Sequence, residues 1–386
     1  MNCRADAGTT DDQQHRDCEH CGCAQDQSAP RPVGLRALRT DRAQQAAHRA
    51  EPREQGLTKG GGTPLRSEPS PPDRAPPSQS TVAQVFTDIE NRPLSSGRAG
   101  VVVGRVLSWY ATNARDLPWR RPDATPWAIM VSEFMLQQTP VERVRGPWQT
   151  WLERWPTPAS LAAAAAGDAV RAWGRLGYPR RALRLHHAAQ MIMNDFDGQV
   201  PEDRESLLRL PGVGAYTAAA IRTFAYGRRE MVLDTNVRRL LTRLAQGVAY
   251  PSSAPTEQER TLAEGLTPRS PERAARWAVA SMELGALVCR ARIPDCAACP
   301  VTSLCAWREA GYPAWEGAPR RSQAYQGTDR QCRGALLAVL RSSDEPIGGR
   351  KLAEAWQDLQ QRDRALASLV QDGLVVALGN RWSLPG

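Results

Sequence analysis

The feature that most constrains how this chain can fold is a short glycine-rich turn between two helical runs, at residues 210–214 (LPGVG). A helical run over residues 202–209 precedes the turn, and an alanine-rich run over residues 215–226 follows it. Its two glycines allow a tight reversal and a close approach of the backbone to a ligand. Backbone N–H groups at the start of the second helix would favour a phosphate. Helix–turn–helix units also occur in many proteins with a purely structural role, so the turn alone predicts only two packed helices.

Helical periodicity continues through most of the chain from residue 100 to residue 288, and strand signals are nearly absent there. Apolar residues recur at the spacing of helix faces, while Pro, Gly and short polar stretches separate the runs. Pro126 fits the first position of a helix. The pattern predicts an all-α core. Further helices are expected at about 141–155, 159–165, 168–175, 179–195, 235–246, 256–266 and 271–288.

Residues 1–95 have a different composition, rich in Arg, Gln, Pro, Ser and Gly and without sustained apolar periodicity. Such a segment cannot bury a core, so we predict a disordered N-terminal tail. Cys18, Cys21 and Cys23 lie beside His20 within it. No second pair of ligands follows at zinc-finger spacing, so a stray cysteine cluster is favoured over a metal site.

The C-terminal part also differs from the helical core. Residues 313–330 are expected to form a linker. Residues 331–386 contain three short helical runs and then a hairpin with the two-residue turn Gly379-Asn380. We predict a small winged-helix-like module here. Such a module binds DNA or packs on a neighbouring domain, and this one is not especially basic.

The chain as a whole is basic, with a formal net charge of +9 from 50 basic and 41 acidic residues. A positive balance favours a polyanionic partner, although compositional drift towards arginine produces the same excess. No apolar run approaches the ~20 residues that span a bilayer, and the N-terminus lacks the apolar segment of a secretory signal. We therefore expect a cytoplasmic, nucleoid-associated protein without a membrane partner.

Two sequence motifs of this chain, in the order in which they occur, resemble motifs of one enzyme family. The turn at residues 210–214 with Asp234 downstream, and the segment from Ser132 to Thr139 (SEFMLQQT), are similar to the signatures of MutY-type adenine DNA glycosylases, a branch of the helix-hairpin-helix glycosylases. The resemblance covers about residues 100–312 and is closest in layout to actinobacterial members with a short C-terminal module. The implied parts are a two-domain glycosylase core at 96–312, with a six-helix barrel at about 124–230 and an iron–sulfur domain at about 96–123 and 231–312.

Glu133 lies among apolar neighbours on its predicted helix, with Ile129, Met130 and Leu136 one turn away. An anion there is costly, so the pKa of the carboxyl group should rise. A carboxyl group that is protonated near neutral pH is what a general acid needs. A lone Glu is more often a solvated helix residue, but the surrounding motif favours catalysis. The resemblance implies that Glu133 protonates adenine N7.

Asp234 follows an apolar run and precedes a helix that starts near Thr235. As the cap of that helix it would contribute about 1 kcal/mol, and the helix N-terminus favours its ionised form. An anion there can also stabilise an oxocarbenium-like sugar, which is the catalytic role that the resemblance implies. Asn236 matches the family's Asp-Gly-Asn segment, with Thr235 in place of the glycine.

Tyr216 and the lysine content predict the subtype. Relatives that resemble endonuclease III carry a lysine at this place in the hairpin, which attacks the sugar as a Schiff-base nucleophile. The only lysines here are Lys59 and Lys351, both outside the core. We therefore predict a monofunctional glycosylase with little or no strand cleavage, in which Tyr216 assists at the sugar cation. The alternative role of Tyr216 is packing.

Four further cysteines have the spacing C-x6-C-x2-C-x5-C, and they are Cys289, Cys296, Cys299 and Cys305. Clustered cysteines in a protein of the cytoplasm favour a metal site over disulfides. The spacing alone leaves zinc open. The resemblance implies that these residues hold a 4Fe–4S cluster with a structural and DNA-positioning role.

The resemblance also assigns residues to DNA and to the extruded base. Gln138 and Tyr178 match residues that enter the helix near the mispaired guanine. The expected DNA contacts are Gln138, Tyr178, Leu210, Pro211, Gly212, Val213 and Gly214, and the expected adenine pocket is lined by Arg115, Trp119, Leu136 and Val141. Many aromatic and aliphatic side chains at helical spacing only pack in the hydrophobic core, without binding a ligand. The family's Phe-Asn-Gln/Glu-Ala is replaced by Trp-Ala-Val-Ala at residues 277–280, which removes a polar group expected near adenine.

Together these features predict an adenine DNA glycosylase of base excision repair, which hydrolyses the N-glycosidic bond of adenine mispaired with 8-oxoguanine or guanine. We expect a monomer that acts on double-stranded DNA with A:8-oxoG or A:G mispairs. One alternative is a related glycosylase for uracil, thymine or an oxidised pyrimidine, which would not need the Glu133 acid. Another is a non-catalytic iron–sulfur DNA-binding sensor, against which the presence of both Glu133 and Asp234 argues. A domain similar to the MutT hydrolases, which many members carry, has no counterpart in the short C-terminal module.

Overall fold

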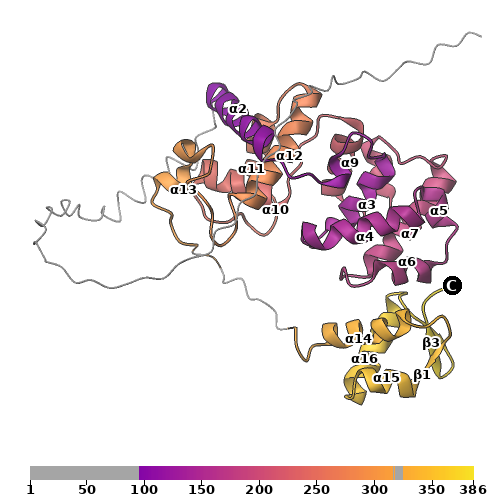
Figure 1. Cartoon of the computed structure of the whole chain (residues 1–386). Coiled ribbons are helices and arrows are strands. Elements are labelled where there is room, and N and C mark those ends of the chain that lie inside the picture. Colours follow the sequence, from indigo (N-terminus) through magenta and orange to yellow (C-terminus); the bar gives the residue numbers. More distant parts are fainter. Residues whose placement is uncertain (1–94, 316, 318–324) are drawn as a thin grey trace, which may run out of the picture. The chain divides into compact units, whose positions relative to one another are not determined.

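The computed structural model describes residues 95–315, 317 and 325–386. All of the predicted disordered tail except Ser95, including its four cysteines, lies outside the described residues. Within the described part helices dominate, and strands occur only near the C-terminus, which confirms the all-α prediction for the core (Figure 1). None of the described helices is long and apolar enough to cross a membrane.

One group of helices encloses an apolar core around α3 (Pro126–Leu136). Its other members are α4 (Val141–Arg154), α5 (Pro158–Ala162), α6 (Ala166–Trp173), α7 (Arg180–Asp195), α8 (Arg204–Arg209) and α9 (Ala215–Tyr226). Every residue of α3 between its two ends is buried, because α4, α7 and α9 all pack against it. Tryptophan rings fill much of this core, and Trp151 packs edge-to-face with Trp155 and Trp173 at centroid distances of 4.6 and 5.6 Å.

The sequence at the ends of α3 explains where the helix begins and ends. The Thr125 side chain accepts a hydrogen bond from the N–H of Ala128 at 3.1 Å, and Pro126 occupies the first position, where no donor is needed. At the other end the buried guanidinium of Arg181 donates to three carbonyl groups. These bonds satisfy carbonyls that have no partner within the helix.

A second group of helices forms its own apolar core from both ends of the helical region. Its members are α2 (Ser96–Asn113), α10 (Thr235–Leu241), the π-helical turn η2 (Thr242–Gln246), α11 (Glu257–Leu266) and α12 (Pro271–Leu287), followed by the short helices η3 (Thr302–Leu304) and α13 (Ala306–Glu309). α2 comes first in the sequence but packs against α11 and α12. The single helix expected at 235–246 is divided into α10 and η2.

The C-terminal module combines three helices with a small sheet. Its elements are α14 (Asp329–Arg341), β1 (Ile347–Gly348), α15 (Gly349–Ala355), α16 (Leu359–Gln371), β2 (Val376–Leu378) and β3 (Arg381–Ser383). β3 pairs antiparallel with both other strands, so that Trp382 lies opposite Ile347 and Ala377. Thr328 caps α14 by accepting from the N–H of Gln331, so the helix starts at Asp329, within two residues of the expected end of the linker.

The module packs on α6 and α7 of the first helix group. Val170 of α6 and Leu183 of α7 belong to the module's apolar cluster. The backbone N–H of Gly167 donates to Pro385 O at 2.7 Å, and Arg341 Nε donates to Val170 O at 2.9 Å. These contacts combine apolar burial with paired backbone groups, which is how packed interiors are stabilised.

Gly285 allows α12 to approach the start of α10 closely. A Cβ atom at residue 285 would lie 2.7 Å from the backbone oxygen of Asn236 and 2.8 Å from its Cβ atom. The carbonyl of Gly285 also accepts a hydrogen bond from Arg239 at 2.7 Å. The position of Asn236, beside Asp234, therefore depends on a glycine in the neighbouring helix.

Gly285→Ala should lower the free energy of unfolding by about 1–3 kcal/mol, the usual cost of overpacking. Gly104→Ala in α2 is the matched control, because nothing lies within 4 Å of a Cβ atom there, and it should raise the stability by about 0.5–1 kcal/mol. Chemical denaturation of both variants measures the difference. Equal stabilities would contradict the close approach of the two helices.

Candidate active site

Glu133 carries its carboxyl group in the middle of the buried helix α3. The residue is 5% exposed, and burial raises the pKa of the carboxyl group to about 7. The negative charge of Asp234 also raises this pKa, while a hydrogen bond from Tyr216 and the charge of Arg120 lower it. The raised pKa that the apolar helix neighbours predicted is confirmed.

Tyr216 and Asp234 form a compact group with Glu133. Tyr216 lies in the first turn of α9, and its hydroxyl donates to the Glu133 carboxylate. Burial and the two nearby carboxylates raise the pKa of Tyr216 well above its usual value, so the hydroxyl keeps its proton. Asp234 caps α10, where Oδ1 accepts from the N–H of Val237 at 2.6 Å and Oδ2 accepts from Asn236 Nδ2 at 2.7 Å.

The two carboxyl groups have different surroundings. Burial raises the pKa of Asp234, but the hydrogen bonds from Val237 and Asn236 and the charge of Arg239 favour its ionised form. Glu133 is surrounded mainly by the apolar interior. Because such surroundings separate the protonation of paired carboxyl groups, the arrangement favours the proton on Glu133 and the negative charge on Asp234.

A buried ion-pair cluster lies beside these groups. Glu283 of α12 has no exposed surface and accepts from Arg115 Nε at 2.7 Å and Nη2 at 2.9 Å. Arg120, in the short helix η1 (Pro118–Arg120), pairs with Glu283 at 3.0 Å, and its charge acts on Glu133 and Tyr216. Its Nη1 atom is buried without a hydrogen-bond partner in the described part of the chain.

Arg239 joins the start of α10 to the cysteine loop. Its Nη2 donates to Asn236 Oδ1 at 2.9 Å, and its Nε donates to Cys289 O at 2.8 Å. Asn236 in turn donates to Asp234. A continuous series of hydrogen bonds therefore connects Cys289 with Asp234 and holds the carboxylate in place.

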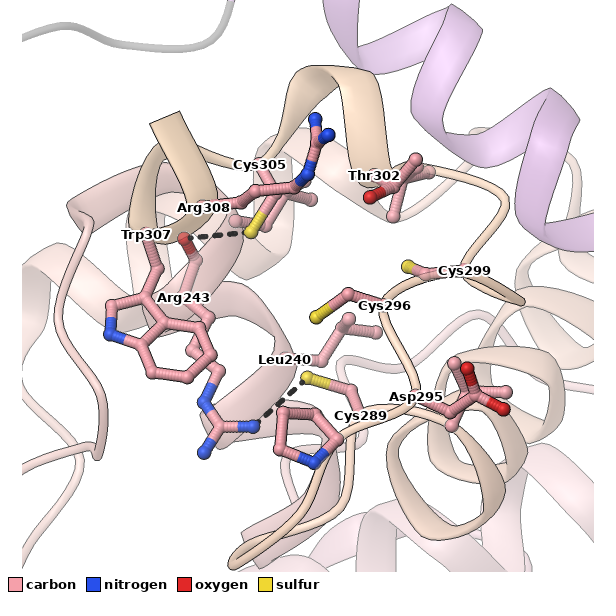
Figure 2. A pocket seen from close by; sticks show the side chains of 14 residues that line it. Leu240, Arg243, Cys289, Asp295, Cys296, Cys299, Thr302, Cys305, Trp307 and Arg308 are labelled. Atoms are coloured by element: carbon pink, nitrogen blue, oxygen red, sulfur yellow. Dashed lines mark hydrogen bonds between the residues drawn. The ribbon is translucent and has the colours of Figure 1, made fainter. Parts of the chain in front are cut away.

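The four cysteines of the predicted cluster site line a single pocket. Figure 2 shows the sulfur atoms of Cys289, Cys296, Cys299 and Cys305 around a common space. None of the four forms a disulfide, and burial raises the pKa of Cys299 to about 12 and also raises that of Cys305. The structure thus brings together residues spread over seventeen positions of the sequence, as their spacing predicted.

The chemistry of this pocket fits a group that thiolates hold. Leu240, Leu244, Val288 and Val301 make its wall apolar, while Arg243 Nη1 lies 3.5 Å from Cys289 Sγ and can offset thiolate charge (Figure 2). Among the described residues, no three His, Cys, Asp or Glu side chains form a group that could hold one metal ion. Four thiols around a shared space are ligands of the kind that protein-bound zinc and iron–sulfur clusters both use.

Gln138 and Tyr178 lie at two exposed turns that Arg181 connects. Both have left-handed backbone conformations, with φ of +54° and +46°, which are uncommon for residues other than glycine. Arg181 Nη1 donates to Gln137 O at 2.6 Å, and its Nη2 donates to Gly177 O at 3.0 Å. One buried guanidinium thus holds the residues that precede both exposed side chains.

The glycine-rich turn exposes only some of its residues. Leu210 and Val213 are buried in the first core, so their side chains stabilise the turn and their predicted DNA contacts are restricted to backbone atoms. Gly212 has φ of +88°, and a Cβ atom there would lie 2.7 Å from the Phe134 ring. Gly214 is exposed at the cap of α9, where the first N–H groups have no helical partner.

The residues predicted to line an adenine pocket occupy two settings. Trp119 is buried and packs edge-to-face with Trp148 at 5.7 Å, whereas Leu136 and Val141 are only partly buried against the same core. Arg115 pairs with Glu283, and Arg120 pairs with the same carboxylate.

Comparison with known proteins is consistent with this geometry. The family model of the HhH-GPD superfamily of base excision DNA repair proteins matches residues 131–267. An adenine DNA glycosylase of Mycobacterium tuberculosis is 50% identical over 296 residues, covering 76% of this chain and 97% of that protein. The chain belongs to the adenine DNA glycosylase family. A thymine-DNA glycosylase of Aeropyrum pernix is 33% identical, covering 55% of this chain and 96% of that protein. A solved thermostable thymine-DNA glycosylase is 26% identical with a TM-score of 0.49, covering 55% of this chain and 96% of that one.

Sequence reasoning did not assign Arg120, Arg181 or Glu283 to the site. A signal existed for Glu283, because it is an acidic residue within an apolar helical run, as Glu133 is. Arg120 lies in a segment already noted for Arg115 and Trp119, but nothing local indicates its partner. Arg181 is one of many arginines, and the carbonyls that it binds come from distant residues.

Glu133→Gln tests the raised pKa. The carboxyl group ionises near 4.5 in the unfolded chain but near 7 in the folded protein, so the wild-type protein loses stability as the pH rises between these values. The loss should total roughly 3 kcal/mol. Glutamine does not titrate, so the stability difference in favour of the variant should grow from about pH 5 to about pH 7 and then stay constant.

Urea unfolding of both proteins across this pH range measures the difference. Glu142→Gln is the matched control, because the side chain of Glu142 is 73% exposed and its removal should leave the pH dependence unchanged. A difference between wild type and Glu133→Gln that is independent of pH would be inconsistent with a buried titrating carboxyl group.

Proposed function

We propose that this protein is a monofunctional adenine DNA glycosylase that removes adenine mispaired with 8-oxoguanine or guanine from double-stranded DNA. The observation that carries the proposal is the buried Glu133 carboxyl group, protonated near neutral pH and grouped with Tyr216 and Asp234. Membership of the adenine DNA glycosylase family supports the same reaction.

The reaction needs an acid because adenine leaves deoxyribose poorly unless a ring nitrogen is protonated. An adenine extruded from the duplex would receive the Glu133 proton at N7. The electron pair of the glycosidic bond then goes to the base, and the ionised Asp234 stabilises the oxocarbenium-like sugar. Water adds to the sugar carbon and gives its proton to the Glu133 carboxylate.

Tyr216 supports a monofunctional reaction. It stands at the place in the hairpin where a lysine would attack the sugar, and its hydroxyl keeps its proton. With no lysine between Lys59 and Lys351, the core has no ordinary amine that could form a Schiff base. Water is then the acceptor of the sugar.

The four pocket cysteines would hold a 4Fe–4S cluster. When bound, the cluster would supply rigidity to the loop rather than redox chemistry, since depurination moves no electrons. A fixed Cys289 carbonyl would hold Arg239, which donates to it and to Asn236. Asn236 in turn donates to Asp234 and would hold that carboxylate in place. The cysteine loop therefore supports the catalytic carboxylate as well as any contact with DNA.

A pyrimidine glycosylase is the second candidate, because the thymine-DNA glycosylase of Aeropyrum pernix is also similar to this chain. The protonated Glu133 favours adenine over this candidate, since a pyrimidine with a less basic ring does not require the same acid.

Single-turnover excision on three duplexes tests the substrate class. The duplexes carry A opposite 8-oxoguanine, A opposite G, and U opposite G, and the products are analysed with and without alkali. We expect adenine release, with strand breaks only after alkali and no adduct trapped by borohydride. Release of uracil instead would favour the pyrimidine candidate, and binding without any release would favour a non-catalytic sensor.

Glu133→Gln and Asp234→Asn should each abolish excision while leaving DNA binding intact, because each removes one charge or proton of the reaction. The wild-type rate should fall as the pH rises through about 7, since the acid form of Glu133 is the active one. Glu142→Gln should retain full activity. Undiminished excision by either active-site variant would exclude the mechanism.

Cys299→Ser should lower the iron and sulfide content of the purified protein and its visible absorption. Cys332→Ser is the matched control, because Cys332 is also a free cysteine but lies buried in the C-terminal module. Zinc in place of iron in both variants and in the wild type would show that the pocket holds a different metal.

A further inference from the structure

We propose that Arg330 of the C-terminal module is a positioning residue for Tyr178, through which the module takes part in reading the base opposite the excised one. The guanidinium of Arg330 lies over the Tyr178 ring, with 5.1 Å between its Cζ atom and the ring centroid. The proposal rests on the proposed function, within which the family resemblance of the sequence implies that Tyr178 enters the helix near the mispaired guanine.

The Tyr178 ring is exposed, so its orientation depends on contacts with neighbouring side chains. The residue is 45% exposed and has a left-handed backbone conformation, which costs free energy in a residue with a side chain. Arg181 lies on it from within the first helix group, with 5.7 Å between its Cζ atom and the ring centroid. Arg330 adds a second guanidinium contact from a different part of the chain, and together they restrict the orientations of the ring.

The docking of the module determines where Arg330 lies. Arg330 is in the first turn of α14, and the last residue of that helix, Arg341, donates to Val170 O in α6. Asp372 makes a second link, because it pairs with Arg333, one turn after Arg330, and with Arg180, two residues after Tyr178. The Arg180 pair has a distance of 3.2 Å. The turn that carries Tyr178 and the helix that carries Arg330 thus share a carboxylate.

The contact is specific to one residue rather than a general effect of charge. Basic and acidic residues nearly balance in residues 325–386, so the module has little net attraction for DNA. Arg364, in contrast, is 61% exposed and pairs with Asp329, beside Arg330, at 3.5 Å. The two arginines lie close together in the same module, but only Arg330 has a described contact with Tyr178.

The test compares Arg330→Gln, Arg330→Lys and the matched control Arg364→Gln in the full chain. Arg330→Gln should bind a duplex with a non-cleavable adenine analogue opposite 8-oxoguanine about two- to fivefold more weakly, the effect of losing an exposed cation–π contact. Arg330→Lys should also bind more weakly, because an ammonium group lacks the planar face of a guanidinium. The single-turnover rate at saturating enzyme and the melting temperature should not change, because Arg330 touches neither Glu133 nor Asp234. Arg364→Gln should match the wild type.

Two further measurements separate positioning from simple attraction to DNA. Lysine retains the charge but not the planar stacking group, so full rescue by Arg330→Lys would overturn the proposal. In a Tyr178→Ala background, Arg330→Gln should have no further effect, since non-additivity identifies coupled residues. An equal loss of binding in that background would also overturn it.

A third readout keeps this inference distinct from the proposed function. 2-Aminopurine placed beside the guanine opposite adenine reports base unstacking by its fluorescence, whether or not a base is excised. We expect the wild type to increase the fluorescence and Arg330→Gln to increase it less. If no duplex loses adenine but the fluorescence still depends on Arg330, the proposed function fails and the positioning role stands. A fluorescence change that is the same in both proteins would refute the positioning role.

Discussion

The Glu133 carboxyl group keeps a proton near neutral pH only as long as α3 stays out of water. A helix with this burial cannot be stabilised at the surface of a small sheet or bundle. It needs other helices on its sides, and α4, α7 and α9 supply them with a core rich in tryptophan. Gly212 also helps to bury α3, because its lack of a side chain lets the turn before α9 pack against Phe134. Tyr216, a few residues later, thereby reaches Glu133.

Buried arginines connect the parts of the site that distant segments contribute. Arg181 connects the end of α3 to the turn before α7, and Arg239 connects the start of α10 to the cysteine loop. Arg120 pairs with Glu283, and its charge acts on Glu133 and Tyr216. A guanidinium offers five donors in a fixed plane, so that one side chain can satisfy several carbonyls at once. Burial lowers the pKa of Arg181 to about 10 and also lowers that of Arg239, but both remain cations. Lysine could not replace arginine at these positions, because its ammonium group lacks the planar set of five donors.

The C-terminal module extends this arrangement to the turn that carries Tyr178. Its apolar core includes Val170 and Leu183 from the first helix group, so the module is packed on that group by shared burial and by hydrogen bonds to the backbone of α6. A small module with little net charge does not attract DNA strongly. What it supplies is a fixed position for α14, and with it a guanidinium over an exposed ring.

The sequence by itself determined the features that depend on neighbours within about one helical turn. It predicted the helical core, the start of α3 at Pro126, the capping position of Asp234 and the apolar surroundings of Glu133, because residues three or four apart share a helix face whatever the rest of the chain does. The convergence of four cysteines also followed from their close spacing. The tertiary structure alone decided the pairings between remote segments. Arg115 and Glu283 are 168 residues apart, and α2 packs with α11 and α12 rather than with α3. It likewise decided that Leu210 and Val213 point into the core and that Arg330 meets Tyr178, since these contacts depend on how helices pack and leave no periodic trace in the sequence.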